Sequence, residues 1–516
     1  MFYSDMNMIT FNDFKKQIVF PQPKMSEPIG KTTKFAIFRY NDPHGNTDVA
    51  TGMYQACKAF KQKHSLDKDT ISITASGGDN VSGGDVAKNR FVFDLMDNLA
   101  GVEVSAVGNH ELDATSNGFY EAIKGKNIKF VATNVELDDD NPLNQVIKKS
   151  LIQEKNGVKY AFVGAMPIDF TACTKKDAQK GIEVEDFDDT VESLQEEIDK
   201  LKAQGINKIF LVSHVGYDTD KKLAQALDGI DVIIGGHTHT VVDGVVEEEN
   251  YVKSKSGEPV LITQTGENGK YYGLVDVEFD ENGILVNTNY KLANSQMTSK
   301  SPIVEFIKEK HLGKSPVVKN IAEVDPMPQN RRNTPCAWTD WLADSMRSEM
   351  NVDIAIVNAA NTRKVPQQGA LTQRDVEESS PMKNKLLTTT ITQKDLVGAV
   401  RQAAKETMSN SDGEPGLLHI SGATYKIDKQ GNLLEMYYID KKGKKTKIDI
   451  DNPSSKVKYS ACYDNFVATE GGEYPLLAPK TKVKEFDFDK TKTMLDYLAK
   501  QKDGLVITDD KRIEIL

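Results

Sequence analysis

Five short polar motifs, each at the end of an apolar run, constrain the fold of this chain more than any other feature. They read Asp42-Pro43-His44, Gly78-Asp79-Asn80, Gly108-Asn109-His110-Glu111, Ser213-His214-Val215 and Gly235-Gly236-His237-Thr238-His239. The preceding runs, among them 34–40, 70–75 and 232–234, have the length and apolar content of buried strands. In an open α/β sheet, functional sites lie at the carboxyl ends of the strands. We therefore expect the five strand ends to bring these polar residues into one crevice.

The side chains in these motifs are of the types that bind borderline divalent metals. The candidate ligands are Asp42, His44, Asp79, Asn109, His214, His237 and His239. In extended backbone, residues i and i+2 point the same way, so Asp42 and His44 could reach one ion. Asp79 follows two glycines that permit a sharp turn, and its carboxylate could bridge two ions. The pattern predicts a centre for a pair of divalent metal ions.

Length and charge restrict the class of protein further. A chain of 516 residues is expected to form two or three domains. Its net charge of −11 argues against a nucleic acid polymer or an anionic membrane as partner. The absence of any 18-residue apolar stretch predicts no membrane span. Four cysteines without a CxxC pair, and no signal segment in the first thirty residues, favour a cytoplasmic protein with free thiols.

The pattern of apolar residues divides the chain into four parts. Residues 1–32 form a polar lead segment, and residues 33–295 alternate short strands with amphipathic helices, which predicts a layered α/β core. Residues 296–325 contain a linker helix that begins near Pro302 and ends before Gly313. Residues 326–516 are predicted to form a separate α+β domain without metal-binding motifs of its own.

In this order, the motifs resemble the calcineurin-like metallophosphoesterase superfamily, and the whole chain resembles its 5′-nucleotidase family, which includes bacterial UDP-sugar hydrolases. The resemblance implies a four-layer β-sandwich flanked by helices, followed by an α+β substrate-binding domain. It assigns one ion to Asp42, His44, Asp79 and His239, and a second ion to Asp79, Asn109, His214 and His237. The segment Gly108 to Asp113 matches the family's Gly-Asn-His-Glu-Phe-Asp, in which His110 and Asp113 would form a catalytic pair.

The resemblance extends more loosely into the C-terminal part. Asn358 to Arg363 stand where relatives have the substrate-holding loop Asn-Gly-Gly-Gly-Ile-Arg. Arg331 and Arg332 lie in the stretch where relatives place one or two arginines that read phosphate or carboxylate. The resemblance therefore implies that Asn358, Arg363, Arg331 and Arg332 bind the substrate.

Relatives hold the nucleobase between two aromatic rings. Residues 468–475 align without a gap to their Ala-Thr-Gly-Gly-Asp-Gly-Phe-Pro, so Tyr474 would supply one ring. Leu417 stands where the other ring is expected. Stacking on one ring contributes roughly 1–3 kcal/mol per base.

The implied activity is removal of phosphate from 5′-nucleotides by a hydroxide that two divalent ions activate. His110 would stabilise the developing charge or protonate the leaving alkoxide, and Asp113 would hold its ring.

A 2′,3′-cyclic-nucleotide phosphodiesterase and a nucleotide-sugar hydrolase are alternatives within the superfamily; a non-catalytic metal-binding protein is the alternative outside it. Zinc, manganese, iron and cobalt all suit the ligands, and neither the metal nor the oligomeric state follows from the sequence. Because many relatives are secreted, a periplasmic or extracellular location is the alternative to the cytoplasm.

Overall fold

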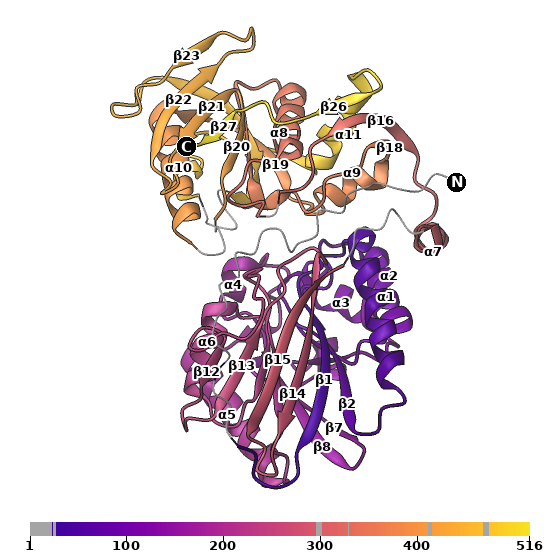
Figure 1. Ribbon diagram of the computed structural model, residues 1–516. Helices are drawn as coiled ribbons and strands as arrows, with labels where there is room; N and C mark the ends of the chain where they lie inside the picture. Colours follow the sequence, from indigo (N-terminus) through magenta and orange to yellow (C-terminus); the bar gives the residue numbers. More distant parts are fainter. Residues whose placement is uncertain (1–22, 24–26, 296–301, 329, 411–414, 468–473) are drawn as a thin grey trace, which may run out of the picture.

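The protein consists of two stacked halves (Figure 1). The computed structural model describes residues 27–295, 302–328, 330–410, 415–467 and 474–516, together with Pro23. The first half ends with β15 (Leu285–Asn294), and the second half begins with β16 (Val317–Val324). Between them lies α7 (Pro302–Leu312), at the place predicted for the linker helix. Most of the predicted lead segment lies outside the described residues.

Two β-sheets form the centre of the first half. The seven-stranded sheet has the order β15-β14-β1-β2-β3-β4-β6, and the six-stranded sheet has the order β12-β13-β11-β10-β8-β7. The strands of the first sheet, besides β15, are β1 (Thr33–Tyr40), β2 (Thr70–Ser76), β3 (Val104–Ala106), β4 (Lys129–Val131), β6 (Ile147–Lys148) and β14 (Tyr271–Phe279). Those of the second are β7 (Ser150–Lys155), β8 (Val158–Ala165), β10 (Ile209–Ser213), β11 (Val232–Ile234), β12 (Tyr251–Lys253) and β13 (Pro259–Thr263).

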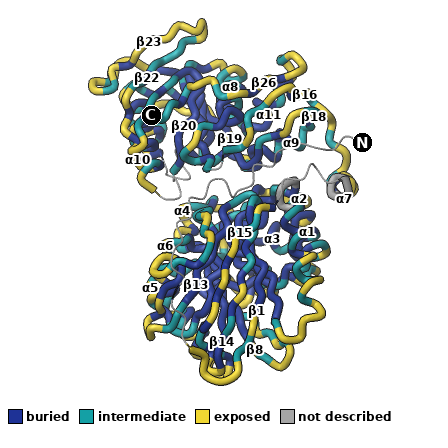
Figure 2. The backbone as a smooth tube through the Cα atoms, in the orientation of Figure 1, coloured by how far each residue is buried: buried dark blue, intermediate teal, exposed yellow. Residues whose placement is uncertain are grey.

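The two sheets pack face to face through apolar side chains. Ile37 and Ile73 of the first sheet belong to the same buried cluster as Phe210 and Ile234 of the second. The central strands β1, β2, β10 and β11 pair in parallel with at least one neighbour. Because both faces of these strands are covered, their sequences are continuous apolar runs rather than alternating patterns. Figure 2 shows that the interior of the first half is buried.

Helices cover the outer faces of both sheets and complete four layers. The seven-stranded sheet is covered by α1 (Thr47–His64), α2 (Val86–Asp94) and α3 (Thr115–Ile123), and the six-stranded sheet by α5 (Phe187–Ala203) and α6 (Tyr217–Ala226). The helix α5 buries Leu194, Ile198 and Leu201, as the 3.6-residue periodicity of its sequence predicts. The four-layer architecture confirms the predicted fold class.

The motif-bearing strands are divided between the two sheets of the sandwich. The strands β1, β2 and β3 lie in one sheet, whereas β10 and β11 lie in the other. The polar motifs still meet, because the strand ends of the two packed sheets adjoin at the same end of the sandwich. Apolar runs reveal strands but not the sheet to which each strand belongs.

The second half is built around a five-stranded sheet of order β20-β17-β24-β19-β25. Its strands are β17 (Ile354–Asn358), β19 (Lys385–Thr392), β20 (Leu418–Ser421), β24 (Lys458–Asp464) and β25 (Lys484–Asp489). One face packs against α10 (Gln393–Ser409), and the other packs against α8 (Ala337–Met350) and α11 (Lys490–Lys500). A three-stranded sheet consists of β16, β18 (Gly369–Thr372) and β26 (Leu505–Ile507). A four-stranded sheet consists of β21 (Ala423–Ile427), β22 (Leu433–Ile439), β23 (Lys445–Lys447) and β27 (Ile513–Ile515).

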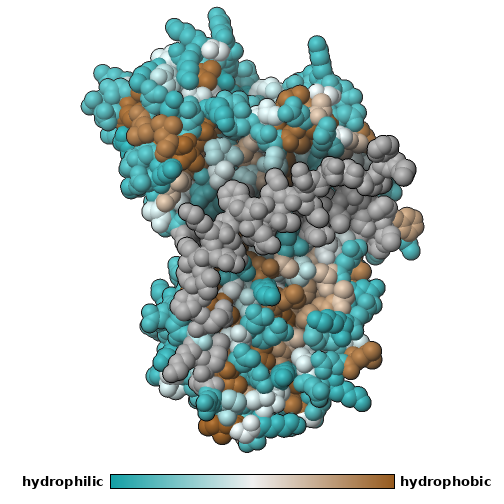
Figure 3. All heavy atoms as spheres, in the orientation of Figure 1, coloured by the Kyte–Doolittle hydropathy of each residue, from teal (hydrophilic) through white to brown (hydrophobic). Residues whose placement is uncertain are grey.

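The face of the molecule drawn in Figure 3 carries many hydrophilic side chains on both halves. On the face drawn in Figure 3, hydrophobic side chains gather only in small groups among hydrophilic ones. Within the described ranges, no helix combines the length and apolar character needed to cross a lipid bilayer. The four cysteines are free thiols, and Cys57, Cys336 and Cys462 are buried.

The packing of the six-stranded sheet gives a test with matched leucines. Leu211 on β10 is fully buried, whereas Leu66 is 90% exposed. We expect Leu211→Ala to lower the free energy of unfolding by about 2–5 kcal/mol, because it removes buried methyl groups and leaves a cavity. The same substitution at Leu66 should change it by less than about 0.5 kcal/mol. Urea unfolding of the two variants measures the difference; equal effects would contradict the buried position of β10.

Candidate metal centre

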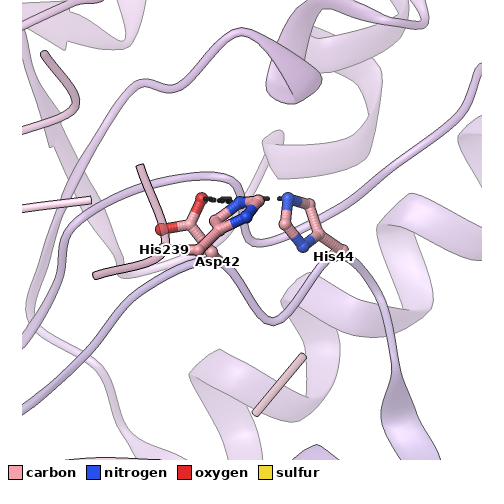
Figure 4. A group of neighbouring side chains, drawn as sticks. All are labelled: Asp42, His44 and His239. Carbon is pink, nitrogen blue, oxygen red and sulfur yellow. Dashed lines mark ion pairs between the residues drawn. The ribbon is translucent and has the colours of Figure 1, made fainter. Parts of the chain in front are cut away.

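Asp42 follows β1, and the two oxygens of its carboxylate have different surroundings. One accepts hydrogen bonds, and the other faces two imidazoles. Its Oδ2 accepts hydrogen bonds from Asn41 Nδ2 at 2.6 Å and from the His237 backbone N–H at 3.0 Å. Its Oδ1 lies 3.3 Å from His239 Nε2 and 3.8 Å from His44 Nε2. Figure 4 shows the three side chains of Asp42, His44 and His239 turned toward one another. These three residues could hold one metal ion.

Asp79, which follows β2, is arranged in the same way. Its Oδ1 accepts a hydrogen bond from the His110 backbone N–H at 2.9 Å. Its Oδ2 lies 3.4 Å from His44 Nε2 and 3.3 Å from His214 Nε2. Asp42, Asp79 and His214 form a further group that could hold a metal ion. The outward oxygen of Asp79 therefore lies between the ligand groups, as expected for a shared ligand.

Hydrogen bonds on the far side of each ring orient the imidazoles. His214 Nδ1 lies 2.7 Å from the carbonyl oxygen of Gly77, and His239 Nδ1 lies 3.1 Å from Glu267 Oε2. An N–H that donates to such an acceptor fixes the orientation of the ring and directs Nε2 toward the carboxylates. His237 is turned the other way, because its Nε2 lies 3.3 Å from the Asp169 carboxylate. Nε2 of His237 therefore contacts a carboxylate outside the candidate ligand set.

Glu111 binds the backbone of two loops that carry candidate ligands. It was not among the residues singled out from the sequence. It is fully buried and accepts backbone hydrogen bonds from Asp79 at 2.9 Å, Asn80 at 2.7 Å and Gly108 at 2.8 Å. Burial and the charge of Asp79 raise the pKa of Glu111 to about 7. By binding the loops after β2 and β3 together, Glu111 fixes where Asp79 lies. The signal was present in the sequence, since Glu111 completes the Gly-Asn-His-Glu motif.

The backbone at five of the candidate ligands is left-handed. The φ angles are 52° at Asp42, 49° at His44, 52° at Asp79, 81° at His237 and 58° at His239. Non-glycine residues rarely adopt this conformation, and each costs about 1–3 kcal/mol unless its surroundings hold it there. The backbone at Asp42 and His44 is therefore not extended, contrary to the prediction from their spacing. A left-handed turn on each side of Pro43 brings the two side chains together instead.

The donor set fits divalent cations. Among the described residues, Asp42 Oδ1, Asn109 Oδ1 and Nε2 of His44 and His214 are buried polar atoms without a hydrogen-bond partner. A buried polar atom left in this way costs about 1–3 kcal/mol. A cation that accepts lone pairs from carboxylate, amide and imidazole atoms would satisfy all of them together. Calcineurin-like phosphoesterases use divalent metals, and these Asp and His groups could bind them.

His110 and Asp113 lie beside this group as a hydrogen-bonded pair. His110 Nδ1 is 2.8 Å from Asp113 Oδ2, which also accepts the Gly83 backbone N–H at 2.7 Å. His110 Nε2 lies 3.9 Å from Asp79 Oδ2 and 3.1 Å from Nη2 of Arg363 in the second half. Burial and the neighbouring Arg331 lower the pKa of Arg363 to about 9. The pair thus presents one ring nitrogen both to the candidate ligands and to an arginine of the other half.

A cavity of about 110 Å³ separates the two halves at this point. The first half contributes Asp79, Asn109, His110, Asp113, His237 and His239 to its wall. The second half contributes Arg332, Asn358, Arg363 and Phe466. Three of the substrate-binding residues expected from the sequence, Arg332, Asn358 and Arg363, therefore line the same cavity as the candidate metal ligands.

The structure places the other two expected substrate-binding residues away from the cavity. Tyr474 is 1% exposed, and its hydroxyl donates to the carbonyl oxygens of Pro415 and Gly416, each at 2.9 Å. Leu417 packs in the same core as Tyr474. Phe466, which follows β24, is the aromatic residue in the cavity wall. Residues 468–473, which were aligned with the base-binding loop of relatives, lie outside the described residues.

Arg331 is the second residue away from the cavity. It is 1% exposed, and its guanidinium contacts the carboxylate of Glu267 in the first half. Neither Glu267 nor this contact was expected, because no motif connects two residues so distant in sequence. Phe466 was missed for a similar reason, since a lone phenylalanine carries no sequence signal of its surroundings.

The charges around His214 predict competition between a metal ion and a proton. Burial alone lowers the pKa of His214, but the carboxylates of Asp79 and Asp42 raise it to about 10. At neutral pH a cation must therefore displace a proton from this ring. We expect the affinity for Mn²⁺ to rise about tenfold per pH unit between about pH 6 and 8, the effect of releasing one proton. Titration calorimetry in buffers of different ionisation enthalpy measures the release; an affinity independent of pH would contradict it.

Comparison with known proteins agrees with this arrangement. The family model described as calcineurin-like phosphoesterase matches residues 37–241, and the model of the 5′-nucleotidase C-terminal domain matches residues 313–479. The chain is 25% identical over 498 residues to the trifunctional nucleotide phosphoesterase protein YfkN of Bacillus subtilis, covering 85% of this chain and 32% of that protein. It is also 25% identical to a probable 5′-nucleotidase of Treponema pallidum. That match covers 62% of this chain and 64% of that protein. The chain thus spans less than two thirds of the length of either relative.

A solved structure shares the whole architecture. The 5′-nucleotidase precursor from Thermus thermophilus superposes with a TM-score of 0.77 at 21% identity, covering 94% of this chain and 99% of that one. The likeness shows that both halves of the fold occur together in that protein. The two family models match the two halves in the same order. The chain therefore belongs to the 5′-nucleotidase family, in which a calcineurin-like phosphoesterase domain precedes a 5′-nucleotidase C-terminal domain.

Proposed function

We propose that the protein is a two-metal phosphoester hydrolase that removes phosphate from 5′-nucleotides. One observation carries the proposal: four candidate metal ligands, the His110–Asp113 pair, and two arginines of the other half line one cavity. The ligands are Asp79, Asn109, His237 and His239, and the arginines are Arg332 and Arg363. The names of relatives, including the probable 5′-nucleotidase of Treponema pallidum, support the substrate class. In this proposal, residues 33–295 bind the metals, residues 326–516 bind the rest of the substrate, and residues 296–325 link them.

The two ions are assigned to the two ligand groups that share Asp79. The first group is Asp42, His44, Asp79 and His239, and the second is Asp79, Asn109, His214 and His237. The first is supported by the short distances among Asp42, His44 and His239, and the second by those between Asp79 and His214. Two bound divalent cations would polarise the phosphoryl oxygens and make water a nucleophile near neutral pH.

The remaining residues of the cavity bind and orient the ester. The guanidinium groups of Arg332 and Arg363 supply positive charge for the phosphoryl oxygens, which offsets the net charge of −11 of the chain. His110 Nε2 faces the same cavity, where the protonated ring would stabilise charge on the phosphoryl group or donate a proton to the leaving oxygen. Asp113 holds the ring through Nδ1, which keeps Nε2 directed into the cavity. Asn358 and Phe466, which line the same cavity, would bind the nucleoside.

The role of His110 gives a test of the mechanism. We expect His110→Ala to lower kcat by roughly 10²–10⁴-fold, the usual effect of removing a positioned proton donor or charge stabiliser. Its metal content should stay near that of the wild type, because His110 is outside both assigned ligand sets. His64→Ala, at the end of α1, is the matched control and should retain activity. Loss of metal from His110→Ala would instead make His110 a ligand.

Phe466 gives a test of the substrate class. We expect Phe466→Ala to lower kcat/KM for AMP by about tenfold, because one stacked ring contributes roughly 1–3 kcal/mol per base. Hydrolysis of p-nitrophenyl phosphate, which has no base, should change much less. Both activities are measured with added Mn²⁺ or Zn²⁺ on a panel that includes 2′,3′-cyclic AMP and UDP-glucose.

Two comparisons complete this experiment. Tyr474→Phe removes only the hydroxyl of a buried ring, so it should leave the ratio of the two activities unchanged. Equal losses on AMP and p-nitrophenyl phosphate in Phe466→Ala would remove base stacking from the proposal. A wild-type preference for the cyclic nucleotide or the nucleotide sugar would replace the proposed substrate by that alternative. Full activity after exhaustive chelation would overturn the two-metal mechanism.

A further inference from the structure

Arg331 joins the two halves of the molecule through a buried ion pair. It lies between β16 and α8 of the second half, and its Nη1 contacts Oε2 of Glu267, which lies between β13 and β14 of the first half. The Arg331 side chain is 1% exposed and that of Glu267 is 14% exposed. Two charged groups are thus withdrawn from water at the junction, beside the candidate metal centre.

The same oxygen of Glu267 contacts a candidate metal ligand. Glu267 Oε2 lies 3.1 Å from His239 Nδ1, and His239 Nε2 lies 3.3 Å from Asp42 Oδ1. A continuous series of contacts therefore leads from Arg331 through Glu267 and His239 to Asp42. A carboxylate on the far nitrogen of a metal-binding histidine fixes the orientation of the ring and increases its basicity. Here that carboxylate is itself held by the opposite half.

We propose that Arg331 is a positioning residue of the metal centre: from the second half it holds Glu267, and Glu267 orients His239 toward the ion shared with Asp42 and His44. The inference rests on the proposed metal centre and adds to it a dependence on the other half of the molecule. It differs from the substrate-binding role that the sequence suggested for Arg331. Arg332 and Arg363 line the cavity, and Arg331 does not.

A purely stabilising role accounts less well for Arg331. Among the described residues, its Nε and Nη2 are buried without a hydrogen-bond partner. Taking a guanidinium out of water is costly unless its donors are satisfied, and buried ion pairs are often no more stabilising than apolar residues of the same volume. The contact with Glu267, in contrast, determines where the carboxylate beside His239 lies.

The proposal predicts weaker metal binding when either member of the ion pair is changed. We expect Arg331→Met and Glu267→Gln each to weaken Mn²⁺ binding by about 10–100-fold, the usual effect of losing a partner of a metal-binding histidine. Chelator competition without substrate measures the affinity. Saturating Mn²⁺ should restore most of kcat with a KM near that of the wild type, because substrate contacts are intact. The double variant should bind Mn²⁺ about as weakly as either single variant, since both act on one contact.

Two control variants separate positioning from other roles. Glu378→Gln breaks a comparably buried pair, in which Glu378 lies 2.7 Å from Lys308 Nζ and 2.8 Å from Lys364 Nζ, away from the metal ligands. It should leave Mn²⁺ affinity unchanged even if it lowers stability. Arg332→Met should raise KM and also leave Mn²⁺ affinity unchanged. If Arg331→Met does not fold, Glu267→Gln, which keeps the shape of the side chain, decides the question alone.

Three results would overturn the inference while leaving the proposed function intact. They are unchanged Mn²⁺ affinity in both variants, equal weakening in Glu378→Gln, and a raised KM that saturating Mn²⁺ does not correct. The last would show that Arg331 binds the substrate. A wild-type protein that binds no divalent cation would instead overturn the metal centre itself, so the two failures are distinguishable.

Discussion

The close approach of two buried carboxylates, Asp42 and Asp79, is the interaction on which the rest of the structure depends. Each is at most 2% exposed, and like charges at this depth repel one another. The fold offsets part of the repulsion by giving each carboxylate a backbone N–H and by placing His214 between them. The remaining oxygens converge on a space that a divalent cation fits. The two packed sheets and the loops after their strands serve to hold these charges together.

The second half of the molecule supplies positively charged side chains to the cavity beside the candidate metal ligands. The proposed substrate, a phosphate ester, is an anion and would approach a site that already contains carboxylates in a chain of net charge −11. Arg332 and Arg363 reach the cavity from the opposite side and make the local field more favourable. Arg363 also contacts His110, so the group proposed to donate a proton touches both halves. A complete site therefore exists only where the two halves meet.

The strands and the ligand motifs were predictable from sequence because both are local signals. A strand buried on both faces reads as a continuous apolar run, and Gly-Asn-His-Glu or Gly-His-Thr-His is contained in a few consecutive residues. The conformation at Asp42 and His44 was not predictable, since a left-handed turn depends on the surrounding loops. The contact of Arg331 with Glu267 and the positions of Phe466 and Tyr474 depend on packing between distant segments. The spacing of residues in the sequence does not predict which distant segments pack together.

The left-handed backbone at five candidate ligands makes residues that serve the proposed activity unfavourable for folding stability. Glycine adopts this conformation without steric cost, so a ligand replaced by glycine relieves strain and, at Asp42 or Asp79, also removes a buried charge. In the absence of metal, such a replacement would remove a local source of instability together with a candidate ligand. Screening of variants for thermal stability alone would therefore enrich inactive proteins. The strained turns mark where function, rather than folding, maintains the sequence.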